Sequence, residues 1–222
     1  MPAGTLDHVR SCAVPTLRTI GLGALAALLV MTTGGCVTGK RPSFADASGD
    51  PAIDAVLTRL EHTGTSQFTA GYTIQTRSTG TTTSASVAIA PPSERSVTIG
   101  DVRFLVDASG SRTCDVPGGR CVQLLQPERV SNIQVGPDFY ASSAAAQLRA
   151  DAAARSGAGT ARTETIAGQP ATCVDISRDG GTKSYCALDD GPLARLDAGG
   201  TAVLVELTAY SPTADRSLFA PA

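Results

Sequence analysis

The sequence predicts an α+β fold that is mainly antiparallel β, with a curved sheet of about ten or eleven strands, an N-terminal helix and one inserted helix. Three observations support this class. Apolar residues recur at helical spacing just after position 50, they alternate with polar residues from position 66 onward, and Gly- or Pro-containing turn signals separate the alternating segments. Successive hairpins connect such strands most simply, and a sheet of this many strands curls or closes.

An apolar run of twelve residues, 20–31, lies near the N-terminus. It is shorter than the roughly 20 residues of a membrane-spanning helix, and Arg10 and Arg18 precede it, which is typical of a secretory signal peptide. The run leads to Gly34-Gly35-Cys36, which resembles the end of a bacterial lipoprotein signal, where the cysteine thiol takes a diacylglyceryl group before cleavage. We therefore expect a signal peptide at 1–35 and lipid on Cys36.

Two alternatives remain for this stretch: an uncleaved anchor, or an ordinary buried cysteine after a hydrophobic helix. Thr33 also stands where the lipoprotein pattern usually has Leu. Two acyl chains on Cys36 would hold the protein on the extracytoplasmic face of the cell membrane. Residues 36–49 lack apolar periodicity and are expected to form a tether, and residues 50–222 a single domain.

The first predicted element of that domain is a helix of about three turns. Asp50 is suited to cap the free amides of the first turn, and Pro51 suits the first helical position. Apolar residues then follow at i, i+3, i+4 and i+7, namely Ile53, Val56, Leu57 and Leu60. Gly64 supplies a stop signal.

Alternation with period two predicts the first group of strands, which should lie near 68–74, 85–89, 97–99 and 102–106. Gly100-Asp101 is typical of a two-residue type II′ connection between the last two. Two more short strands should flank Pro117-Gly118-Gly119. Beyond them, residues 138–156 predict the inserted helix, an Ala-rich segment with little apolar surface that could act as a movable cover over the sheet.

Strand patterns return in the last third of the chain. Turn signals at 167–168, 179–180, 189–191 and 198–200 separate them. The expected strands are 160–166, 171–176, 182–188, 193–196 and 203–207.

Four cysteines in the predicted domain are expected to form two disulfides. If Asp179-Gly180 is a two-residue hairpin loop, Cys173 lies opposite Cys186 at a non-hydrogen-bonded position, with Cα atoms about 4.5 Å apart, a disulfide-compatible separation. A four-residue loop at 116–119 likewise places Cys114 opposite Cys121. Export to an oxidising compartment favours these bridges. A zinc site is the alternative, but the spacing within each pair is wider than in zinc knuckles.

The sequence offers little for catalysis. Its 18 Lys and Arg residues and 20 Asp and Glu residues give a net charge of −2, which argues against a nucleic-acid partner. No nucleophile, metalloprotease or phosphate-loop motif is present, and His62 is the only histidine after the predicted signal. Asp189-Asp190, Glu164 and Glu206 could pair as acid and base, although Asp189-Asp190-Gly191 is more typical of a hairpin turn. We expect a non-enzyme without cofactor or metal.

The order of elements resembles the LolA/LppX-like lipoprotein carrier superfamily. The similarity covers residues 51–222: the leading helix, the strand Val174-Asp175-Ile176 after Ala167-Gly168-Gln169-Pro170, and the closing Leu207-Thr208-Ala209-Tyr210 followed by Phe219-Ala220-Pro221. Members fold as a half-open β-barrel whose concave side is closed by helices and receives acyl chains. The two disulfides and the predicted lipid depart from the soluble periplasmic carrier and are closer to mycobacterial-type lipid-carrier lipoproteins.

The resemblance implies a cavity on the inner face of the curved sheet, where buried methylenes of an acyl chain would each contribute about 0.8 kcal/mol. Alternate strand residues are the candidates to line it: Phe68, Tyr72, Ile74, Val87, Ile89, Phe104 and Val205. We expect a membrane-anchored lipoprotein that binds or carries a lipid or other hydrophobic ligand. In the alternative, the same residues fill a core against the first helix, and the protein is a structural or protein-interaction lipoprotein without a ligand.

Overall fold

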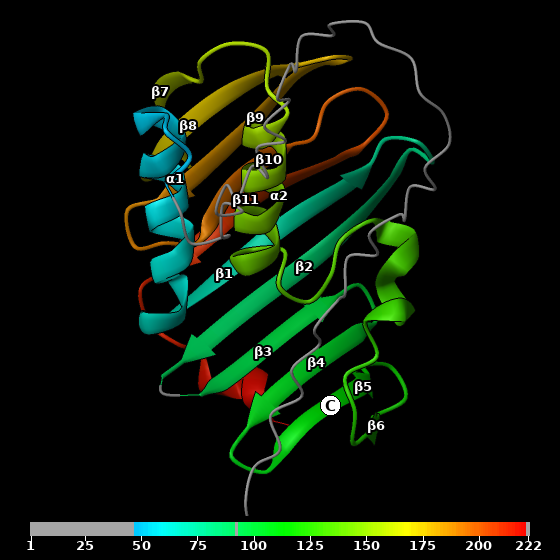
Figure 1. The fold of residues 1–222 in the computed structure, drawn as a ribbon. Coiled ribbons are helices and arrows are strands. Elements are labelled where there is room, and N and C mark those ends of the chain that lie inside the picture. The colour runs from blue at the N-terminus through cyan, green and yellow to red at the C-terminus, as the bar shows by residue number, and fades with distance from the viewer. Residues whose placement is uncertain (1–46, 92, 221–222) are drawn as a thin grey trace, which may run out of the picture. The chain divides into compact units, whose positions relative to one another are not determined.

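A computed structural model describes residues 47–91 and 93–220, and these residues form a single antiparallel sheet of eleven strands with two α-helices on one face (Figure 1). The predicted signal peptide 1–35, Cys36 and nearly all of the predicted tether lie outside the described residues. The fold class predicted from the sequence is confirmed. No helix among the described residues is both long and apolar enough to cross a membrane.

The sheet consists of two meanders that meet in its middle. In space its order is β6-β5-β4-β3-β2-β1-β11-β10-β9-β8-β7, and the edge strands β6 and β7 do not pair, so the sheet stays open. The strands of the first meander are β1 Phe68–Thr76, β2 Thr81–Ala90, β3 Glu94–Ile99, β4 Val102–Asp107, β5 Gly110–Asp115 and β6 Arg120–Val122. Those of the second are β7 Thr160–Ile166, β8 Gln169–Arg178, β9 Gly181–Leu188, β10 Leu193–Asp197 and β11 Val203–Ser211.

The hairpins follow the local turn signals. Gly100 has φ 56°, as the first central position of a type II′ turn requires, and Ile99 pairs with Val102 across it. The antiparallel pairing of β1 with β11, in which Ile74 lies opposite Val205, was not predicted because no turn signal connects strands so far apart in the sequence.

Helix α1, Pro51–His62, begins as predicted. The Asp50 carboxylate accepts hydrogen bonds from the amides of Ala52 (3.0 Å) and Ile53 (3.5 Å) at the helix start. Its second oxygen accepts from the Gly159 amide at 2.6 Å, and this bond is the main reason that the pKa of Asp50 lies below its usual range. The predicted apolar stripe is buried against the sheet. Because Asp50 also binds the Gly159 amide, the cap of α1 holds the segment that leads into β7 as well.

The inserted helix is shorter than predicted. Helix α2 spans Ser142–Ala153, four residues after the expected start at 138. Phe139 and Tyr140 instead lie in consecutive turns, where the Phe139 amide donates to Gly136 O and the Ala141 amide to Asp138 O. In these turns both aromatic rings are buried in the core. A 3-10 helix, η2 (Pro127–Ile133), was also not predicted.

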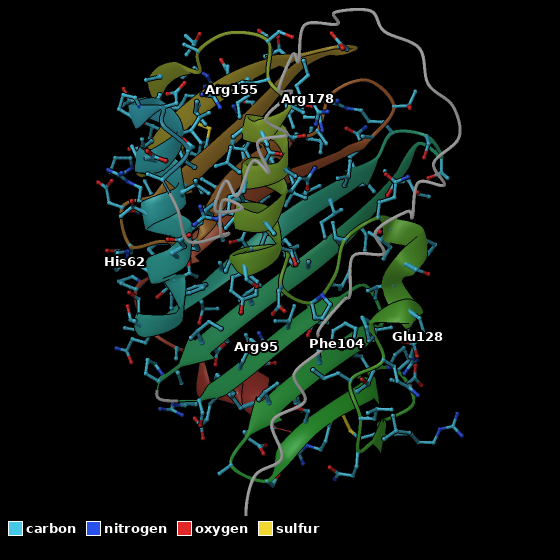
Figure 2. All side chains as sticks on the ribbon, viewed as in Figure 1. His62, Arg95, Phe104, Glu128, Arg155 and Arg178 are labelled. Carbon is cyan, nitrogen blue, oxygen red and sulfur yellow. A yellow bond between two sulfur atoms is a disulfide. The ribbon has the colours of Figure 1, made fainter. Side chains whose placement is uncertain are left out.

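A buried carboxylate holds α2 on the sheet. Asp151 accepts hydrogen bonds from Lys183 Nζ (2.9 Å), from Arg178 and from the Tyr185 hydroxyl, all of which come from β8 and β9. Figure 2 shows Arg178 near the C-terminal end of α2. Burial alone would raise the pKa of Asp151, but these hydrogen bonds hold it below its usual value. Most of the buried side chains of α2 are alanines, so Asp151 adds a polar link to the sheet beside the packing of Leu148.

Both predicted disulfides are present. Cys114 bonds to Cys121 and Cys173 to Cys186, each with a Cα separation of 4.0 Å. Cys173 lies opposite Cys186 in the β8–β9 pair, in the register that a two-residue loop at 179–180 requires. All four sulfurs are bonded to each other in pairs, which leaves no thiolate among these residues for the alternative zinc site.

Candidate functional site

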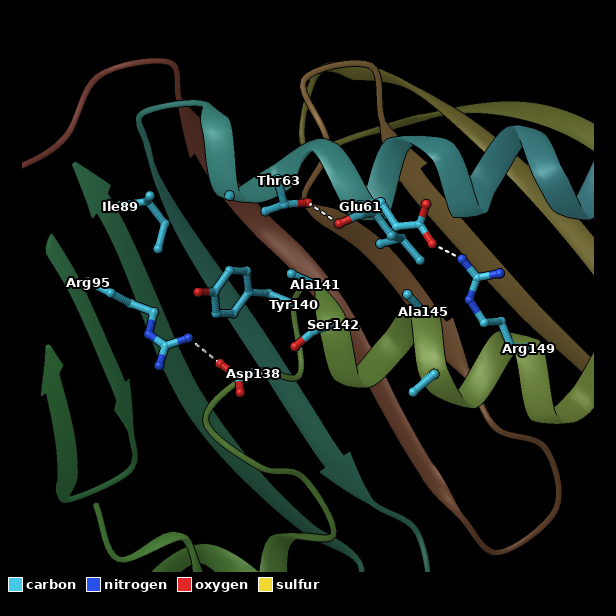
Figure 3. Close-up of a pocket in the computed structure, with 13 residues that line it drawn as sticks. Glu61, Thr63, Ile89, Arg95, Asp138, Tyr140, Ala141, Ser142, Ala145 and Arg149 are labelled. Atoms are coloured by element: carbon cyan, nitrogen blue, oxygen red, sulfur yellow. Dashed lines mark hydrogen bonds and ion pairs between the residues drawn. The ribbon is translucent and has the colours of Figure 1, made fainter. Parts of the chain in front are cut away.

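A cleft of about 690 Å³ opens between the two α-helices and the first meander (Figure 3). The end of α1 and the 3-10 turn after it (η1, Thr63–Thr65) form one wall, the first turns of α2 form another, and the ends of β2 and β3 form the floor. Its size falls within the range of small-molecule sites. The apolar part of the lining consists of Leu60, Gly64, Ile89, Tyr140, Ala141, Ala145 and Ala146.

The charged residues of the cleft neutralise one another. Arg149 of α2 pairs with Glu61 of α1, and Arg95 of β3 pairs with Asp138 in the segment before α2 (Figure 3). The Thr63 hydroxyl donates to the Leu60 carbonyl oxygen at 2.8 Å. The Arg149–Glu61 ion pair thus connects the two helices, and the Arg95–Asp138 ion pair connects the sheet to the segment before α2. The cleft therefore presents an apolar interior without a net charge.

Small side chains on α2 create the space. Ala145 and Ala146 line the cleft with small side chains, and a second hollow of about 190 Å³ shares Ile89, Arg95 and Tyr140 with it. Burial raises the pKa of Tyr140 to about 12, although Arg95 opposes the shift, so its hydroxyl is neutral at physiological pH. Tyr140 therefore lines both hollows and contributes an apolar ring and a neutral hydroxyl group.

The seven residues predicted to line a cavity all lie on the sheet face that carries α1 and α2, which we call the inner face. Strand pairing places Phe68 opposite Ile89, Ile74 opposite Val205, and Phe104 opposite Val97, itself opposite Val87. All seven are buried in the hydrophobic core, and Ile89 is the one that also lines the cleft. Their role in ligand binding stays a prediction.

The other walls of the cleft were missed from the sequence. Leu60 was assigned to the helix stripe, and Ala145 and Ala146 had no apolar periodicity to distinguish them. The usable signal was the lack of large apolar side chains in the inserted helix, because a run of alanines over a sheet leaves space that large side chains would fill.

Comparison with known proteins finds distant similarity to solved structures only. No protein-family model matches the sequence, and no curated protein matches it. Among solved structures, the chain is similar to MucB (12% identity, TM-score 0.48, 78% of this chain and 64% of that one) and to the Pseudomonas aeruginosa MucA/MucB complex (12%, 0.45, 77% and 61%). A LolA superfamily protein from Nitrosomonas europaea also matches (12%, 0.26, 72% and 91%). The chain spans about three fifths of the MucB chains that it matches.

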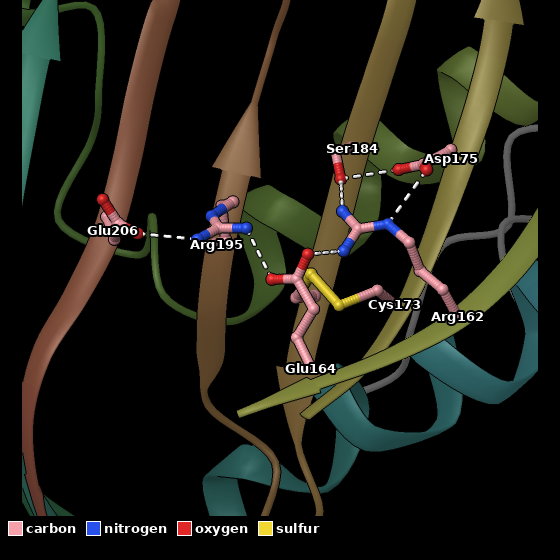
Figure 4. The surroundings of a disulfide bond; sticks show 8 residues. Arg162, Glu164, Cys173, Asp175, Ser184, Arg195 and Glu206 are labelled. Carbon is pink, nitrogen blue, oxygen red and sulfur yellow. Dashed lines mark hydrogen bonds and ion pairs between the residues drawn. A yellow bond between two sulfur atoms is a disulfide. The ribbon is translucent and has the colours of Figure 1, made fainter. Parts of the chain in front are cut away.

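The carboxylates considered as acid–base candidates lie apart in separate contacts. Asp189 pairs with Arg59, with Asp189 Oδ1 3.0 Å from Arg59 Nε, and Asp190 accepts a hydrogen bond from the Tyr210 hydroxyl at 3.0 Å. Glu164 and Glu206 are on the opposite, outer face of the sheet, where both bind Arg195 (Figure 4). None of them lines the cleft.

Glu164 belongs to an ion-pair network over the Cys173–Cys186 disulfide on that outer face (Figure 4). Arg162 binds Asp175 through Nε at 2.9 Å and also pairs with Glu164. Ser184 joins the network by donating to Asp175 Oδ1 at 2.7 Å. Every charged side chain of this network has a partner. The network lies over the disulfide and links all five strands of the second meander.

Proposed function

We propose that the protein binds the apolar chain of a lipid or another hydrophobic molecule in the cleft, without catalysing a reaction. The observation that carries this proposal is a cleft of about 690 Å³ with apolar walls whose charged groups are already paired. Such a cleft gains binding energy from buried methylenes, about 0.8 kcal/mol for each. It supports recognition of apolar matter better than recognition of a charged metabolite, which would need a free counter-charge.

A cavity-filling substitution tests this proposal. Ala146→Phe should weaken binding of an acyl lipid about tenfold or more, because the ring would occupy space where the chain packs and the loss of two buried methylenes alone slightly exceeds a factor of about ten. The measurement is displacement of the neutral fluorescent dye N-phenyl-naphthylamine by monoacylglycerol from the purified domain. Ala146 is exposed at the cleft, so the change should not disturb the core.

Ala150→Phe is the matched control. Ala150 is also an exposed alanine of α2 but does not line the cleft, so the same ring there should leave lipid binding unchanged. Equal binding by both variants would show that the cleft is not the site. Failure of the unaltered protein to bind dye or lipid would contradict ligand binding itself.

A second candidate function is protein interaction. Val122 and Leu124, 45% and 62% exposed, are the large apolar residues that the described chain leaves in solvent, and they lie at and just beyond the edge strand β6. Exposed apolar residues beside an unpaired strand edge are typical of contact surfaces. A protein that binds no lipid in the dye assay would favour this function.

We further propose that lipid on Cys36 anchors the domain to the outer side of the cell membrane. The support is the sequence pattern of residues 20–36. Cys36→Ser should abolish lipid attachment and either release the protein into the soluble fraction or leave the precursor uncleaved, as measured by fractionation and intact mass. A single chain binds membranes only marginally, so the two chains of a diacylglyceryl group are needed for stable retention. Unchanged processing and retention of the serine variant would exclude the lipid anchor.

A further inference from the structure

The hydroxyl of Tyr72 is buried without a hydrogen-bond partner. The residue is 2% exposed, and no donor or acceptor among residues 47–91 and 93–220 reaches its oxygen. An unpaired buried hydroxyl is costly, and a phenylalanine would fill the same place without that cost. A group in this state is therefore expected to have a partner in some other state of the protein.

A continuous series of aromatic rings connects this hydroxyl to the cleft. Tyr140 lines the cleft and packs edge-on against Phe139 with centroids 5.8 Å apart. Phe139 in turn packs edge-on against Tyr72 at 5.0 Å. Phe139 and Tyr140 thus separate the cleft from the Tyr72 ring.

The segment that carries these two rings is not part of a helix or a strand. It consists of turns, and Ala141 at the start of α2 provides no side-chain cap. The Leu193 amide donates to Tyr140 O at 2.8 Å, Asp138 pairs with Arg95, and the Tyr140 ring also packs edge-on against Phe68 with centroids 6.1 Å apart. Displacement of the two rings would open the Tyr72 ring to the cleft.

We propose that the Tyr72 hydroxyl donates a hydrogen bond to a neutral carbonyl oxygen, such as that of an acyl ester, of a ligand that enters the cleft and displaces Phe139 and Tyr140. This inference rests on the proposed function of the cleft and adds the chemical class of the ligand. The carbonyl would satisfy the hydroxyl, and the apolar chain would replace the ring contacts that are lost.

Two features indicate a neutral acceptor and not a carboxylate. The arginines of the cleft are already engaged, Arg95 with Asp138 and Arg149 with Glu61, so a buried carboxylate would lack a counter-charge. Burial, together with the nearby Tyr140 and Tyr210 hydroxyls, also raises the pKa of Tyr72 well above its usual value, which keeps the hydroxyl a neutral donor. An esterified acyl chain meets both conditions, whereas a free fatty acid does not.

The test compares two ligands that differ by one carbonyl oxygen: monopalmitoylglycerol, which has an ester, and the hexadecyl glycerol ether, which lacks the carbonyl. Dye displacement should show that the unaltered protein prefers the ester about tenfold, and that Tyr72→Phe removes the preference by weakening ester binding only. Tyr210→Phe is the matched control. It removes the same atom from the same aromatic cluster, but that hydroxyl already binds Asp190, so the ester preference should persist.

Stability supplies an independent readout on the ligand-free protein. Tyr72→Phe should leave the thermal unfolding midpoint unchanged or raise it, whereas Tyr210→Phe should lower it. A lower midpoint for Tyr72→Phe would mean that a bound water already satisfies the hydroxyl and would overturn the inference. Equal binding of ester and ether by the unaltered protein would overturn it too while leaving the hydrophobic-ligand function intact. Binding of neither lipid would count against the proposed function itself.

Discussion

Replacing Asp151 with asparagine is expected to lower the free energy of unfolding by about 3 kcal/mol, as removal of one partner from a buried charge cluster does. The carboxylate is buried and serves three donors, and asparagine cannot serve all of them. The estimate is at the low end for such sites because Arg178 and Lys183 are partly exposed and can turn to solvent. Chemical denaturation of the purified domain measures the change.

The stability that Asp151 contributes should depend on pH. The pKa of Asp151 is lowered in the folded protein, so its stabilisation is present above the unfolded value of about 3.9 and is lost as the pH falls through the folded value. The difference in free energy of unfolding between the unaltered protein and Asp151→Asn should therefore be constant at neutral and mildly acidic pH and should become smaller below about pH 4. Asp189→Asn, which breaks a pair whose carboxylate side chain is 61% exposed, is the control and should change stability little. A small loss for Asp151→Asn would mean that α2 is held by its apolar contacts instead.

Removal of the Cys173–Cys186 disulfide is the second change with a large expected effect. The double substitution Cys173→Ala and Cys186→Ala should cost about 3 kcal/mol from chain entropy alone, given the 13-residue separation. Both cysteines are fully buried beneath the Arg162–Glu164 network, so loss of the sulfurs also leaves a void in the packed sheet. The midpoint of denaturation, compared at constant slope, reports the loss.

Cys114→Ala with Cys121→Ala is the matched comparison. That bridge closes a shorter loop, with a separation of 7, and Cys121 is exposed in the edge strand β6. Its loss should cost about 2 kcal/mol, less than the other bridge. A larger loss of stability for this pair than for Cys173–Cys186 would contradict the expectation that the longer loop and the fully buried cysteines make the Cys173–Cys186 bridge the more stabilising one.

Local signals made much of the fold predictable. Asp50-Pro51 defines the start of α1 because a cap and a first-turn proline act within a few residues, and the turn at 179–180 sets the register that joins Cys173 to Cys186. The β1–β11 pairing depends on contacts between distant segments, which no short pattern encodes. The start of α2 was wrong because Phe139 and Tyr140 are placed by burial and not by helical propensity.

The site was harder to predict than the fold. Period two identified the inner face, and Ile89 does line the cleft. The remaining walls come from segments whose proximity depends on how α1 and α2 pack together. The unpaired Tyr72 hydroxyl was invisible from the sequence, since a tyrosine at a buried strand position normally finds a partner.

The position of β1 beside β11 has a consequence for biosynthesis. Each meander is built from neighbouring hairpins, but the pair in the middle of the sheet joins the first strand of the domain to the last. A chain that emerges from its N-terminus cannot complete this sheet until Val203–Ser211 has emerged as well. Until then β1 keeps an open edge, so the central pairing of the sheet forms only after nearly the whole domain has been synthesised.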